Sequence, residues 1–101
     1  MYTNLEKLLY YTFDHSNINA HDCTDEECIE VILMTSYSFK MSSSRDGNDR
    51  EMFVGKPAIS ETILEVGVEY MEDPLTNEEI EHIFHGMKAR KANIKESGYV
   101  E

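Results

Sequence analysis

Lysine and arginine are scarce in this sequence of 101 residues. There are nine of them against twenty aspartates and glutamates, which gives a formal net charge of −11 at pH 7. Neither base occurs between Leu8 and Phe39 or between Pro57 and Met87, stretches that contain six and eight carboxylates. Long stretches of one charge sign repel nucleic acid and anionic membranes and attract basic surfaces. The charge therefore argues against nucleic acid and membranes as direct partners and predicts a protein partner with a basic surface.

Long apolar runs and cysteine-rich patterns are also missing. The longest apolar run, Val31–Met34, is far too short to cross a bilayer. The first residues show no basic region followed by an apolar stretch, so we expect no signal peptide. The two cysteines, Cys23 and Cys28, are then expected to be reduced thiols in the cytoplasm of a cell or of an infected host. Hydrophobic residues make up 41% of the chain, enough for one core, so we expect a single acidic domain over residues 1–101.

The motif Thr-x-x-Glu, typical of a helix N-terminus, occurs at Thr3, Thr24, Thr62 and Thr76, and we expect the first, second and fourth to begin a helix. Each occurrence precedes a segment with apolar residues at helical spacing. We therefore expect a mainly α domain with a loop over 42–56 that is mobile at 42–49. The four expected helices cover approximately 3–16, 24–41, 58–72 and 76–95.

An α+β fold is the alternative, because two segments also alternate like strands. Leu64, Val66 and Val68 would face one side of a strand, whereas a helix there has Gly67 in its interior at a cost of about 1 kcal/mol. The alternative order is α-β-β-β-α, with strands in 29–41, 50–55 and 62–71.

In the helical interpretation four glutamates, Glu61, Glu65, Glu69 and Glu72, line one face of 58–72 at a spacing of about 6 Å. Such like charges weakly destabilise a helix. We interpret the row as the partner-binding surface, with an ordinary solvated face as the alternative. Reversing Glu65 and Glu69 to Lys is then expected to abolish binding and leave the fold intact.

Metal binding is a weaker hypothesis. Histidines and cysteines that could ligate zinc stand in two groups, but their Cys-x₄-Cys and His-x₂-His spacings depart from the usual zinc patterns. We therefore predict no metal and no cofactor. The candidate ligands are His21, Cys23, Cys28, His82 and His85.

No nucleophile motif and no glycine-rich phosphate loop is present, so we predict that the protein is not an enzyme. We predict that the protein binds and inhibits a partner macromolecule. It would contact a basic surface of that partner, of the kind that binds nucleic acid, and would thereby mimic nucleic acid. The small size, acidity and lack of catalytic motifs resemble the proteins that phages make to disable host machinery. This resemblance rests on no motif, so it implies no residue role.

Two further functions stay open from the sequence. One is a metal- or small-molecule-binding regulatory domain, or a sponge for a ligand. The other is self-association, because some apolar residues fall outside the main helical stripes and could form a homodimer face. Those residues are Leu33, Met34, Leu64, Val68 and Met71.

Overall fold

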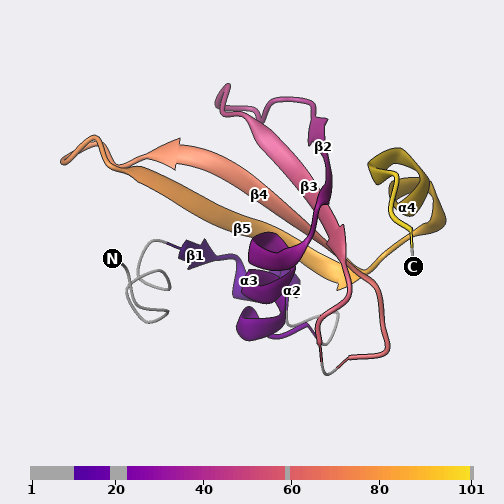
Figure 1. The fold of residues 1–101 in the computed structure, drawn as a ribbon. Coiled ribbons are helices and arrows are strands. Elements are labelled where there is room, and N and C mark those ends of the chain that lie inside the picture. The colour runs from indigo at the N-terminus through magenta and orange to yellow at the C-terminus, as the bar shows by residue number, and fades with distance from the viewer. Residues whose placement is uncertain (1–10, 19–22, 59, 101) are drawn as a thin grey trace.

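The computed structural model of the chain describes residues 11–18, 23–58 and 60–100. These residues form a five-stranded sheet in the order β1-β5-β4-β3-β2, accompanied by three short helices (Figure 1). β1 pairs with β5 in parallel, and the other neighbours are antiparallel. The elements are β1 (Tyr11–Phe13), α2 (His15–Ile18), α3 (Asp25–Met34), β2 (Tyr37–Met41), β3 (Arg50–Gly55), β4 (Leu64–Glu72), β5 (Glu79–Lys88) and α4 (Lys91–Ser97).

The expectation of a mainly α, helical protein is wrong, and the α+β alternative fits better. The longest described helix, α3, has ten residues, and no helix in the described part of the chain is long and apolar enough to cross a membrane. The helix expected over 24–41 ends at Met34, and its remainder forms β2. The helix expected over 58–72 is replaced by β4. Of the helix expected over 3–16, residues 1–10 lie outside the described residues, and the rest contains β1 and the start of α2.

The helix expected over 76–95 is also wrong, because Thr76 lies in a hairpin turn rather than at a helix start. The Asp73 side chain accepts a hydrogen bond from the Leu75 N–H at 2.8 Å, and the Asp73 carbonyl accepts one from Asn77 at 2.8 Å. Asn77 has a φ of 60°, a left-handed conformation that asparagine tolerates well. Asp-Pro followed by Asn therefore turns the chain back, and the residues after the turn extend as β5. Only the C-terminal part of the expected helix is helical, as α4.

The capping box at Thr24 is confirmed. The Thr24 side chain accepts from the Glu27 N–H at 3.2 Å, and the Glu27 carboxylate accepts from the Thr24 N–H at 3.1 Å. These bonds satisfy two backbone donors that a helix otherwise leaves unpaired. The Thr-x-x-Glu motif is sufficient to predict this helix start because each capping bond joins residues only three positions apart.

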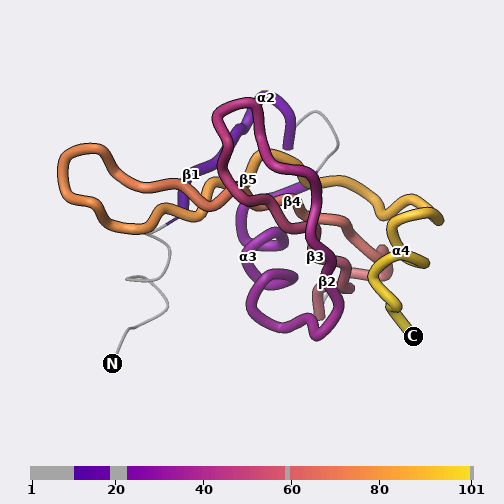
Figure 2. The backbone as a smooth tube through the Cα atoms, turned by 90° about the horizontal axis from the view of Figure 1, so that it is seen from above, coloured from indigo at the N-terminus to yellow at the C-terminus, as the bar shows by residue number. Residues whose placement is uncertain are grey.

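The core lies between α3 and one face of the sheet. Val66, Val68 and Ile83 are fully buried on that face, and α3 packs over them with Cys28 and Val31. Figures 1 and 2 show α3 against the strands and α4 beside the ends of β2 and β3.

α4 covers one end of the opposite face, where Val54 is fully buried and Tyr37 packs edge-on against Tyr99. The apolar residues considered for a homodimer face do not form one surface. Leu64 and Val68 belong to the core, whereas Leu33 and Met34 are exposed on α3. Self-association therefore stays a prediction without a defined face.

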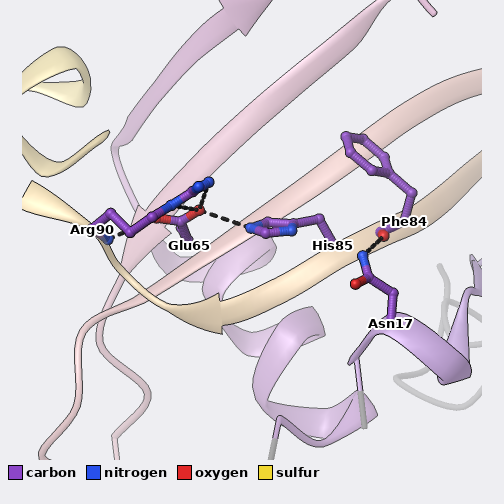
Figure 3. Close-up of polar contacts among 5 residues, drawn as sticks. All are labelled: Asn17, Glu65, Phe84, His85 and Arg90. Carbon is purple, nitrogen blue, oxygen red and sulfur yellow. Dashed lines mark hydrogen bonds and ion pairs between the residues drawn. The ribbon is translucent and has the colours of Figure 1, made fainter. Parts of the chain in front are cut away.

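Gly67 suits its position in β4 because the ring of Phe84 occupies the space that a side chain would take. A Cβ at Gly67 would lie 2.7 Å from Phe84 Cζ. A bulge between Gly67 and Val68 leaves Phe84 as an extra residue on β5, and the Phe84 carbonyl accepts a hydrogen bond from Asn17 Nδ2 at 2.6 Å (Figure 3). Asn17 of α2 thereby supplies a hydrogen-bond donor to the backbone carbonyl of the bulged residue.

Candidate functional site

The end of the β4–β5 hairpin projects from the body of the protein as an arm, defined here as residues 69–82. Figures 1 and 2 both show it extending away from the helices. β3 pairs with β4 only up to Glu69, and β1 pairs with β5 only from Glu81 onward. Among the described residues, no strand therefore pairs with 71–80 on either outer edge. This segment is a two-stranded ribbon whose residues are exposed or half-buried.

The arm contains six carboxylates and no lysine or arginine. Glu72 and Glu79 are direct cross-strand partners, and both are exposed. Like charges placed opposite each other destabilise a strand pair. None of the six forms a salt bridge with another described residue. Arg50 of β3 stands opposite Glu69 at the base of the arm, but none of the other five carboxylates pairs with a lysine or arginine among the described residues. The six are Glu69, Glu72, Asp73, Glu78, Glu79 and Glu81.

The tip of the arm adds an apolar contact point. Leu75 is 91% exposed in the turn, the highest exposure among the large hydrophobic residues described. Where the arm leaves the body, an open groove of about 350 Å³ runs along Tyr70 and the β2–β3 loop, and its acidic lining consists of Asp49, Glu72 and Glu79. This combination of carboxylates, a half-buried tyrosine and an exposed leucine suits the cationic, partly aliphatic side chains of lysine and arginine.

The predicted row of Glu61, Glu65, Glu69 and Glu72 does not exist as a stripe, because β4 is a strand. Adjacent side chains of a strand point to opposite faces, so Glu65 and Glu69 share one face and Glu72 points to the other. Glu61 lies exposed in the loop before β4, and Glu69 accepts a hydrogen bond from Asn48 Nδ2 at 2.8 Å. Only Glu69 and Glu72 belong to the arm.

Glu65 is fully buried under the start of α4 (Figure 3). Its carboxylate accepts hydrogen bonds from the Arg90 backbone N–H at 2.7 Å, from Arg90 Nη2 at 2.7 Å and from His85 Nε2 at 2.7 Å. Burial alone would raise the pKa of Glu65. The hydrogen bonds from Arg90, His85 and Asn93 outweigh burial and lower the pKa to about 2. Glu65 therefore anchors α4 to the sheet and is not available to a partner.

The Glu65 cluster is better suited to structure than to catalysis. The buried carboxylate already accepts bonds from a histidine and from two groups of Arg90, and no hydroxyl or thiol nucleophile is bonded to His85 in the part of the chain that the structure describes. The Arg90 side chain is 59% exposed, so its charge is shared between Glu65 and water. A carboxylate in this position fixes Arg90, the N-cap residue of α4.

The predicted metal ligands fall on two sides of the sheet. Cys23 precedes α3 and Cys28 lies in it; both are buried on the α3 side of the sheet, with their Sγ atoms 3.6 Å apart. His82 bonds Thr12 Oγ1 through Nδ1, and His85 bonds Glu65, both on the α4 side. His21 lies outside the described residues. Among those described, no three metal-ligating side chains gather at one point.

Four arm carboxylates, Asp73, Glu78, Glu79 and Glu81, were not among the predicted site residues. They lie in the base-free stretch from Pro57 to Met87, but the helical interpretation places an acidic row only in the first half of that stretch. Asp-Pro and Asn around the turn are the residues that could have indicated a hairpin.

Comparison with known proteins assigns no family: no family model matches the chain, and no curated protein matches its sequence significantly. Neither an inhibitory action nor a likeness to phage proteins gains support from the fold.

Proposed function

We propose that this protein binds a basic surface of a partner protein through the arm, without catalysis. The observation that carries the proposal is the pairing of Glu72 with Glu79 on a ribbon that no other described strand flanks. A ribbon that retains like charges opposite each other gives up stability. A cationic partner would relieve that repulsion on binding, so the repulsion favours the bound state.

The distribution of charge supports the same function. Five of the nine bases lie just after β3, at the end of β5, or in α4 and its N-cap, and Figure 1 shows these elements at the other end of the molecule from the arm. This separation gives the protein an acidic end and a more basic end, so its field would orient a cationic partner toward the arm during encounter. These five bases are Lys56, Lys88, Arg90, Lys91 and Lys95.

The test compares charge reversals of equal size at the two ends. Glu72→Lys with Glu79→Lys replaces one like-charge pair by another, so the fold should keep its stability while the sign of the arm reverses. Glu61→Lys with Glu96→Lys changes two exposed glutamates outside the arm by the same total charge. Wild type, arm variant and control are immobilised and exposed to a cell lysate at low and high salt.

We expect a protein that is retained by wild type and control, lost by the arm variant, and released from wild type as salt rises, because exposed charges are screened beyond about 10 Å at 0.1 M. The captured protein is then titrated into isotopically labelled wild type, and the amide shifts are expected to change within the arm. Binding that survives both arm reversal and high salt would contradict the proposal. So would shifts confined to α3 or α4.

A further inference from the structure

The two cysteines lie on either side of the capping box of α3. Cys23 immediately precedes the N-cap Thr24, and Cys28 is the fourth residue of the helix. In helices with a capping box, the side chains at these two positions often pack together as a staple. Here the staple consists of two thiols, with Sγ atoms 3.6 Å apart and exposed residue fractions of 3% and 0%.

The sheet leaves a space for the two sulfurs opposite Gly86 of β5. A Cβ at Gly86 would lie 2.9 Å from Cys28 Sγ and 3.3 Å from Cys23 Sγ. The absence of a side chain at this position therefore permits the close approach of the pair. A disulfide bond of about 2.05 Å requires the sulfurs to approach by about 1.5 Å more, which small rotations of two adjacent side chains can supply.

The pair is chemically asymmetric. The hydrogen bond from Cys28 lowers the pKa of the Cys23 thiol, whereas the hydrogen bond with Cys23 and burial raise the pKa of Cys28. Cys23 is therefore the first of the two to become a thiolate, the form that attacks disulfides.

We propose that Cys23 and Cys28 are a covalent modification site, which forms an intramolecular disulfide by exchange with a small disulfide such as oxidised glutathione. The Cys23 thiolate attacks one glutathione sulfur and releases the other glutathione as a thiolate. The Cys28 thiol then loses its proton, attacks the Cys23 sulfur and releases the second glutathione. Two protein thiols are oxidised, one glutathione disulfide is reduced to two thiols, and the two protein protons end on them. Because both cysteines are buried, exchange proceeds through local opening at the start of α3.

The experiment measures whether folding favours the disulfide. The full chain is equilibrated in glutathione buffers of graded redox ratio, both folded and in concentrated guanidinium chloride. Each sample is quenched with acid, alkylated with N-ethylmaleimide and weighed by intact-mass spectrometry, where the reduced form takes up two maleimides and the disulfide form none. We expect the equilibrium constant for the disulfide to be at least about 10-fold larger in the folded chain.

A second readout follows from linkage, because the disulfide must stabilise folding by the same factor by which folding stabilises the disulfide. The folding equilibrium constant of the oxidised protein should therefore exceed that of the reduced protein by the same ratio. Gly86→Ala places a methyl group against the sulfurs and should lower the ratio, each variant being compared with its own unfolded chain. Equal constants in the folded and unfolded wild type, or a smaller one in the folded chain, would overturn the proposal and leave the cysteines as a reduced, packed staple.

Discussion

Replacing Glu65 by Gln tests whether the buried carboxylate anchors α4. Gln has nearly the same shape, but its NH₂ group must face either Arg90 or His85, both of which donate to Glu65 in the native structure. The lowering of the Glu65 pKa from 4.5 to about 2 corresponds to about 3 kcal/mol in favour of the ionised form. The Arg90 side chain is 59% exposed and can turn to water, which reduces the cost of losing its partner.

We therefore expect Glu65→Gln to lower the free energy of unfolding by about 2–3 kcal/mol, a loss typical of a broken buried ion pair that is partly solvated. Urea unfolding followed by far-UV circular dichroism and tyrosine fluorescence measures the effect, since the chain has six tyrosines and no tryptophan. With a slope of about 1.5 kcal/mol per molar urea, the midpoint should fall by about 1–2 M.

Glu96→Gln is the matched control. It removes the same charge from α4 at an exposed position, so the free energy of unfolding should change by less than about 0.5 kcal/mol. The same comparison bears on the earlier expectation that reversing Glu65 leaves the fold intact, which the burial of this side chain now argues against. If Glu65→Gln and Glu96→Gln unfold at the same urea concentration, the buried network does not anchor α4 and the reasoning fails.

Two further predictions concern acid and the helix cap. Because the folded pKa of Glu65 is depressed, its contribution to stability is present above about pH 4.5 and is lost as the pH falls toward 2; acid titrations of unfolding should show this loss of about 3 kcal/mol in wild type and not in Glu65→Gln. Thr24→Ala removes the bond from the Glu27 N–H to Thr24 Oγ1 and keeps the bond from the Thr24 backbone N–H to the Glu27 carboxylate, so it should cost about 1 kcal/mol in thermal or urea unfolding. Thr76→Ala, in an exposed turn, should cost less than about 0.5 kcal/mol. Equal losses for the two threonines would contradict the assignment of a stabilising helix cap to Thr24 and of an ordinary turn position to Thr76.

The sequence by itself determined those features that depend on neighbouring residues or on composition. The acidity and the two long base-free stretches are properties of composition that no fold can change. The start of α3 at Thr24 was correctly predicted, since its capping bonds span three residues. The alternation in 62–71 correctly indicated β4 as the alternative, because the period of a strand is local too.

Tertiary structure decided whether each segment became a helix or a strand, where the sequence pattern was compatible with both. The same Thr-x-x-Glu motif begins a helix at Thr24 and lies in a turn at Thr76, because pairing with β4 extends the residues after Thr76. Neither strand satisfies its backbone donors alone, so the choice of strand over helix for 64–72 and 79–88 is made jointly across the hairpin.

Local sequence patterns likewise could not show which carboxylates are buried and which are exposed. Glu65 and Glu72 look equivalent in the sequence, yet Glu65 is buried because Arg90 returns to it from 25 positions away, and Glu72 is exposed opposite Glu79. Charge alone is a property of the residue. Whether that charge is neutralised inside the protein or presented on an arm depends on which distant strand or helix lies beside it, and only the folded chain brings those partners together.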